Sequence, residues 1–176
     1  MAEGSNDIRM VGFRTAIPCV CRYTEERMGL DIDIHINVEG RFSFYITDRE
    51  KAMGRFLGSS DDCSYTEDAL RTYVRRCMLE LVGAAVIGVS SAGVEYFEFI
   101  GSDSPLSKRM LELTKIGDRF DGIEVTEVDI TKVIPCDEDI EQIHNMEEMF
   151  RLTDPDVAAA RRISELKKKF DSFGQV

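Results

Sequence analysis

Five cysteines are the side chains of this sequence best suited to chemistry. They are Cys19, Cys21, Cys63, Cys77 and Cys136. Cys19 and Cys21 lie two positions apart, a spacing at which a strand points both side chains to one face. A structural zinc site needs four Cys or His ligands at close spacings. Because the chain has no CxxC motif and only His35 and His144 besides, we expect free thiols in a reducing compartment.

An acidic stretch at residues 137–148 is the second candidate site. Its carboxylates are Asp137, Glu138, Asp139, Glu141, Glu147 and Glu148. The stretch does not have the glycine that an EF-hand loop requires at its sixth position. Acidic side chains early in a helix interact favourably with the positive end of the helix dipole. We therefore expect a solvated helix face and predict no metal site.

The common catalytic motifs are also absent from the sequence. It contains no GxSxG, phosphate loop, GxGxxG or HExxH. Gly83, Gly88 and Gly93 cluster without the lysine of a phosphate loop, so we expect them to allow tight packing of a helix on a sheet. Neither His35 nor His144 is paired with a nucleophile in the sequence pattern. The sequence thus predicts no enzyme, no catalytic residue and no cofactor, with a hydrolase of unrecognised type as a remote alternative.

Composition and charge narrow the class of partner. The 176 residues are 43% hydrophobic, enough for a packed core, and carry a formal net charge of −11. A negative field of this size repels phosphate backbones, so we expect no nucleic-acid binding. The first residues contain no apolar signal-peptide segment, and no apolar stretch is long enough to span a bilayer. We expect a soluble, cytoplasmic protein.

Period-two alternation predicts the strands that organise the fold. Over residues 29–39 the apolar positions are Leu30, Ile32, Ile34, Ile36 and Val38, and the residues between them are polar. Residues 41–47 resume the alternation after Gly40, which we interpret as a bulge in one long bent strand. An edge strand is predicted over residues 8–23. A further strand is predicted over residues 123–134, with a second bulge at Thr126 and Glu127.

Cap residues predict two helices after the long strand. Asp48 can cap a helix over residues 49–57, which Gly58 ends. Ser64 and Glu67 form a capping box for a helix that reaches about residue 86. The small, apolar residues 83–93 fit either the end of this helix or a strand, and that choice stays open.

The second half of the chain reads mainly as helix. Residues 94–100 fit either a short strand or a helical turn. Ser104 and Pro105 predict the start of a helix to about residue 120. Residues 137–150 form a further amphipathic helix, whose apolar positions are Ile140, Ile143, Met146 and Phe150.

A last helix, predicted to begin near Thr153, is the candidate association element. Its apolar stripe follows heptad spacing and consists of Ala159, Ile163, Leu166, Phe170 and Phe173. Its other face holds the basic cluster Arg161, Arg162, Lys167, Lys168 and Lys169. An amphipathic helix of this kind can touch a membrane surface, so membrane contact is at most peripheral. The simpler interpretation is a solvated polar face opposite an apolar seam.

These elements predict an α+β fold. We expect a small, mostly antiparallel, bent sheet packed by two or three helices and followed by a C-terminal helix with a short heptad seam. Residues 1–150 would form the α+β domain and residues 151–176 the C-terminal helix.

Three stretches resemble the SPFH (band 7) domain of prohibitins, stomatins and flotillins, and most closely its soluble bacterial virion-core-protein-like branch. The first is MGLDIDIHINVEGRFSFYITDREKAMGRFLG, similar to the family's long bent strand and short helix. The second is YTEDALRTYVRRCMLELV, similar to its central amphipathic helix. The third is FDGIEVTEVDITKVIPCDEDIEQIHNMEEM, similar to its closing strand and helix. Together they cover roughly residues 28–165.

The resemblance implies a non-enzymatic scaffold that associates with copies of itself or with another protein. The chain departs from the family pattern in its abbreviated N-terminal strands, its missing membrane anchor and a stalk of only about twenty residues. A monomeric acidic adaptor or inhibitor that binds one protein target is the alternative. The mass of the protein in solution separates these two expectations.

Overall fold

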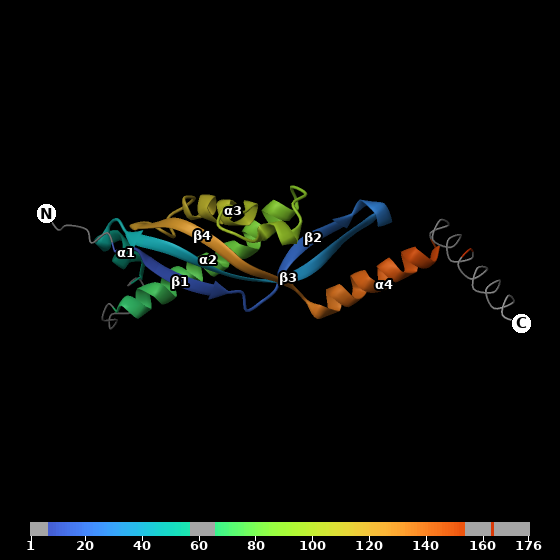
Figure 1. Ribbon diagram of the computed structural model, residues 1–176. Helices are drawn as coiled ribbons and strands as arrows, with labels where there is room; N and C mark the ends of the chain where they lie inside the picture. Colours follow the sequence, from blue (N-terminus) through green and yellow to red (C-terminus); the bar gives the residue numbers. More distant parts are fainter. Residues whose placement is uncertain (1–6, 57–65, 154–162, 164–176) are drawn as a thin grey trace, which may run out of the picture.

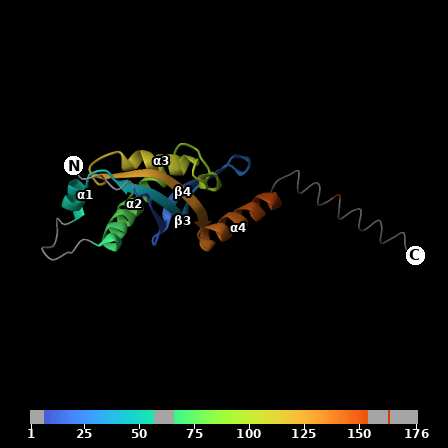
Figure 2. The ribbon, with the colours of Figure 1, turned by 60° about the vertical axis from the view of Figure 1, so that its left-hand side comes forward.

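The computed structural model describes residues 7–56, 66–153 and 163, and within them the chain folds as predicted into an α+β unit. Four antiparallel strands form one open sheet, and helices cover one of its faces. Figures 1 and 2 show α2 and α3 packed together on the sheet, while the C-terminal α4 leads away from both.

The central strand is β3 (Leu30–Ile46), and every other strand pairs with it. On one edge lies β4 (Ile123–Pro135). The other edge is shared by β1 (Arg9–Arg14) and β2 (Cys19–Glu25), which pair with successive halves of β3. The predicted single edge strand over residues 8–23 is therefore two strands.

Thr15 bridges the break between β1 and β2. Its backbone N–H donates to the carbonyl of Val38 at 3.0 Å, and its Oγ1 accepts from the N–H of Val38 at 3.0 Å. Proline at position 18 cannot donate to a strand ladder. The side chain of Thr15 thus supplies the hydrogen bond that the backbone loses where the edge strand is interrupted.

The bulge predicted at Thr126 and Glu127 is present, and a second irregularity lies beside Gly40, but its extra residue is Thr131 of β4 rather than a residue of the long strand. The register with β3 shifts between Glu39 and Gly40, opposite Thr131, and again between Ser43 and Phe44, opposite Thr126. Each threonine Oγ1 donates to the carbonyl of the β3 residue before the shift, at 3.2 Å in both cases. These hydroxyls replace ladder bonds that a bulge breaks.

The alternation of β3 sorts its side chains as expected. Ile34, Ile36 and Val38 are at most 1% exposed, while Leu30 and Ile32 are half-buried near the end of the sheet. His35 faces solvent with the polar residues. Only this one apolar face of the sheet needs covering, and α2 and α3 pack on it.

Helix α1 (Arg49–Phe56) begins after Asp48, whose Oδ1 accepts from the N–H of Lys51 at 3.1 Å, as predicted. Its predicted stop at Gly58 lies outside the described residues. Helix α2 (Glu67–Ser90) is capped by Thr66, whose side chain accepts from the N–H of Ala69 at 3.2 Å. The cap is therefore not Ser64, which lies outside the described residues, because the helix begins two residues later than a Ser64 cap requires.

Helix α2 continues past residue 86 and resolves the open choice for residues 83–90 in favour of helix. Its buried side chains after that point include Val89, which packs into the core. The 3-10 turn η2 (Tyr96–Phe99) likewise shows that residues 94–100 are a helical turn rather than a strand.

Helix α3 (Pro105–Thr114) begins as predicted, with Ser104 accepting from the N–H of Ser107 at 3.1 Å. It ends six residues before the predicted end at residue 120. Gly117, with a φ of 82°, takes a left-handed conformation that an α-helix cannot contain.

Helix α4 (Asp137–Thr153) follows β4 directly. The helix continues across the predicted boundary between the α+β domain (residues 1–150) and the C-terminal helix (residues 151–176). Most of residues 151–176 lie outside the described residues, so this boundary stays a prediction. No helix in the described part of the chain is long and apolar enough to cross a membrane.

Candidate association surfaces

Of the five residues predicted to form the association stripe, the structure describes Ile163 alone. Ile163 has a helical backbone, and the residue is 56% exposed. Ala159, Leu166, Phe170 and Phe173 lie outside the described residues. The preceding helix α4 is described in full, and it also has exposed apolar side chains.

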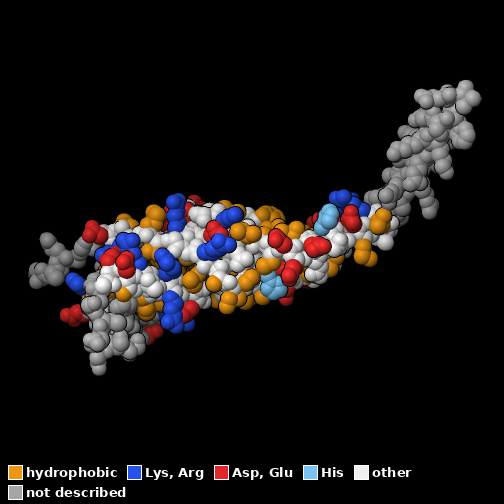
Figure 3. Space-filling view, turned by 90° about the horizontal axis from the view of Figure 1, so that it is seen from below, with side chains coloured by type: hydrophobic (Ala, Val, Ile, Leu, Met, Phe, Trp, Pro, Cys, Tyr) orange, Lys and Arg blue, Asp and Glu red, His pale blue; other side chains and the backbone are white. Residues whose placement is uncertain are grey.

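None of the residues of α4 is buried. Ile140 is 48% exposed, Met149 67% and Leu152 61%. Met149 and Leu152 are three positions apart and therefore neighbours on one side of the helix. Figure 3 shows hydrophobic side chains at the surface of α4 beside acidic ones. We call this helix, with these three exposed side chains, the α4 arm.

The root of the α4 arm is held on β3 by hydrogen bonds at His35. The N–H of Cys136 donates to the carbonyl of His35 at 2.8 Å, and the N–H of His35 donates to Oδ2 of Asp139 at 2.6 Å. These bonds occupy the edge of β3 where β4 ends. The sequence pattern placed Asp139 on a solvated helix face and His35 on the polar face of a strand, and gave no sign that they meet.

Three apolar side chains of the arm are partly covered. Ile143 packs against the core, while Met146 and Phe150 are half-buried. Burial raises the pKa of Tyr23 on β2, and the carboxylates of Glu25 and Glu147 raise it further. The charge of Glu147 therefore acts on Tyr23 of β2. Met149 and Leu152, in contrast, are exposed.

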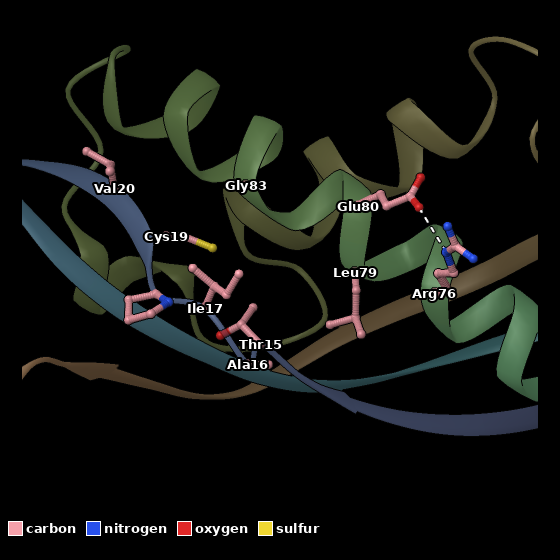
Figure 4. A pocket seen from close by; sticks show the side chains of 10 residues that line it. Thr15, Ala16, Ile17, Cys19, Val20, Arg76, Leu79, Glu80 and Gly83 are labelled. Atoms are coloured by element: carbon pink, nitrogen blue, oxygen red, sulfur yellow. Dashed lines mark hydrogen bonds and ion pairs between the residues drawn. The ribbon is translucent and has the colours of Figure 1, made fainter.

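A second exposed apolar surface lies between the β1–β2 connection and α2. It is a groove of about 470 Å³, which Figure 4 shows with its side chains. Its lining consists of Thr15, Ala16, Ile17, Pro18, Cys19, Val20, Arg76, Leu79, Glu80 and Gly83. Ile17 is 81% exposed and Val20 41%. We call this surface the α2 groove.

Gly83 lies on the α2 wall of this groove without any close neighbour. A Cβ atom placed on Gly83 would have nothing within 4 Å. The expectation that this glycine allows tight packing of the helix on the sheet is therefore wrong. A glycine inside a helix costs roughly 0.5–1 kcal/mol relative to alanine, and no contact within the described chain compensates for that cost.

Charged side chains border the groove. Arg76 lies 3.3 Å from Glu80 one turn along α2, and Arg119 lies 3.0 Å from the same carboxylate. Arg14 and Arg75 line a neighbouring hollow of about 510 Å³ at the end of β1. The side chains of Arg14 and Arg76 are 69% and 81% exposed.

The open face of the sheet carries paired charges rather than a catalytic arrangement. Arg22 lies 2.6 Å from Asp31, and its hydrogen bond holds the pKa of that carboxyl below the usual range. Arg41 and Asp129 are 3.0 Å apart. Tyr45 donates to Glu124 at 2.5 Å, which raises the pKa of the phenol. Charge pairs across strands of this kind stabilise a sheet and have no nucleophile among them.

Three of the four described cysteines are buried thiols that are not poised to react, and the fourth, Cys136, is half-buried with a pKa that desolvation and then nearby carboxylates raise. Cys19, Cys21 and Cys77 are buried, and burial raises the pKa of each thiol, to about 11 for Cys21. A thiol with a raised pKa is a weak nucleophile and a weak metal ligand at neutral pH. Cys63 lies outside the described residues. Among the residues that are described, no three His, Cys, Asp or Glu side chains are grouped to hold a metal ion.

No family model matches this chain, and no curated protein does either. The resemblance to the SPFH domain therefore stays a prediction from the sequence.

Proposed function

We propose that this chain is a non-enzymatic SPFH-like assembly module that associates with copies of itself through the α4 arm and the helix predicted to follow it. The observation that carries the proposal is the exposure of Met149 and Leu152 on a helix that buries none of its residues. An isolated helix of this length is marginal in water, so its apolar side chains need a partner surface.

The family part of the proposal is supported by the order of the elements. A long bulged strand, a short helix, a long amphipathic helix, and a strand that runs directly into a final helix follow one another as the resemblance leads one to expect. The proposal includes a cytoplasmic location, which the odd number of cysteines without a CxxC pair supports.

The mass of the protein in solution tests the proposed self-association. By sedimentation or light scattering at micromolar concentration, the wild type should exceed the 19.9 kDa of one chain. The variant Met149→Gln/Leu152→Gln should move toward that mass with an unchanged melting temperature, because both side chains are exposed and glutamine keeps a good helix propensity.

Ile116→Gln is the matched control, since Ile116 is 63% exposed but follows α3, outside both surfaces. It should leave the mass unchanged. A wild type that is monomeric at every concentration would contradict the proposal and favour the monomeric adaptor. A large fall in the melting temperature of the arm variant would show that the arm is part of the core.

A further inference from the structure

We infer that the α2 groove of one copy receives the α4 arm of a second copy, so that the chains associate head to tail. The inference rests on the proposed function, because it names the surface that the arm contacts.

Both surfaces expose apolar side chains. The arm presents two adjacent exposed apolar side chains, Met149 and Leu152, near its C-terminal end. The groove is a concave apolar surface whose exposed wall residues are Ile17 and Val20. Each surface is left uncovered within the described residues.

Gly83 leaves open space on the α2 wall of the groove. Small residues at an interface let a second backbone approach closely. Within the described residues nothing lies within 4 Å of the Cβ position of Gly83. No contact within the described chain explains a glycine at this position. A partner helix packed against this wall would explain it.

Charge favours the groove over a second arm as the acceptor. The arm carries the six carboxylates of residues 137–148, so two α4 helices side by side would bring like charges together. Arg14 and Arg76 beside the groove are exposed, and each lies 3.3 Å from its present carboxylate partner. A guanidinium has five N–H donors and can take a further carboxylate from the arm.

The far end of the arm does not lie over the groove of its own chain. Figures 1 and 2 both show α4 leading away from α2. We therefore assign the groove to the arm of another copy. A contact between two different surfaces of identical chains is heterologous, and it leaves one free arm and one free groove at the ends of every open assembly.

Two single-surface variants test this arrangement by complementation. The arm variant is Met149→Gln/Leu152→Gln, and the groove variant is Ile17→Gln/Gly83→Gln, which removes an exposed apolar wall residue and fills open space. Each variant alone should be monomeric. Mixed in equal amounts, they should form a 1:1 dimer, because the intact arm of the groove variant fits the intact groove of the arm variant.

The outcomes separate this inference from the proposed function. If the groove variant keeps the mass of the wild type while the arm variant is monomeric, copies meet arm to arm, and the inference fails while the proposed function stands. If both variants are monomeric and the mixture is too, the groove is not the acceptor. A monomeric wild type sinks both proposals. Ile116→Gln should behave as wild type throughout, and unchanged melting temperatures show that each variant is folded.

Discussion

His35 and Asp139, 104 positions apart in the sequence, are joined twice by one carboxylate oxygen. The backbone N–H of His35 donates to Oδ2 of Asp139 at 2.6 Å, and Nδ1 of the ring lies 3.1 Å from the same oxygen. Asp139 is also in the first turn of α4, where its charge favours the helix dipole. The side chain of Asp139 thus stabilises the first turn of the α4 arm and also fixes the arm to the edge of the central strand.

Replacing Asp139 by alanine should loosen the root of the arm. The N–H of His35 loses a charged acceptor, which costs about 1.5–3 kcal/mol for a hydrogen bond of this type. Hydrogen exchange at the amide of His35 should accelerate accordingly, and chemical denaturation should show a matching loss. Asp137→Ala is the control, because Asp137 is an exposed residue of the same turn. Equal effects of the two changes would show that only the helix dipole is involved.

The pair of Arg9 and Glu67 should make stability depend on pH. Arg9 lies 2.6 Å from Glu67 and links β1 to the first turn of α2. Its hydrogen bond holds the pKa of Glu67 below the ordinary value. A carboxyl whose pKa is lowered by folding stabilises the protein above its unfolded pKa, about 4.3, and this contribution is lost as pH falls through the lower folded value.

Glu67→Gln should therefore lower the free energy of unfolding at pH 7 by about 0.5–1 kcal/mol, a small value because the pair is partly exposed. The difference from wild type should vanish near pH 3. Urea denaturation at both pH values measures it, and Asp68→Asn, the exposed neighbour, is the control. A difference that persists at pH 3 would assign the effect to something other than this ion pair.

Ile34→Asp should destabilise the fold severely. Ile34 is 1% exposed in the middle of β3, so the new carboxylate would be buried without a partner. We expect a loss of more than about 4 kcal/mol in the free energy of unfolding, or failure to fold. Asp33→Asn on the exposed face should change little. An unaltered melting temperature for Ile34→Asp would mean that the two faces of β3 are assigned the wrong way round.

Gly40→Ala and Gly54→Ala should have opposite effects. A Cβ on Gly40 would lie 2.7 Å from the carbonyl oxygen of Asp129 and 2.8 Å from the ring of Phe13, so we expect a loss of about 1–3 kcal/mol. Gly54 is in helix α1 with nothing within 4 Å of its Cβ position, so alanine there should add about 0.5–1 kcal/mol. Thermal denaturation of the two variants compares them directly, and equal shifts would refute the close packing at Gly40.

Local pattern was enough to predict the elements whose signal lies in neighbouring residues. The alternation through Ile34 and Ile36 gave the buried face of β3, and the phase slip at Thr126 gave a bulge, because side-chain direction in a strand follows from position alone. Cap chemistry gave the starts of α1 and α3 at Asp48 and Ser104. It failed for α2, where Thr66 rather than Ser64 caps the helix, because several polar residues precede that helix and each can cap it.

What the sequence determined by itself is therefore the α+β class, the inner face of the long strand and the amphipathic helix that follows the last strand. Tertiary structure alone decided which apolar residues remain uncovered. Ile17 and Gly83 are 66 positions apart by their numbers, and they line one groove only because β2 pairs with β3 and α2 packs on the face they share. His35 meets Asp139 because β4 pairs with β3 and α4 follows β4 directly. Contacts between distant residues depend on how the helices and strands pack together. The spacing of apolar residues along the sequence does not specify that packing.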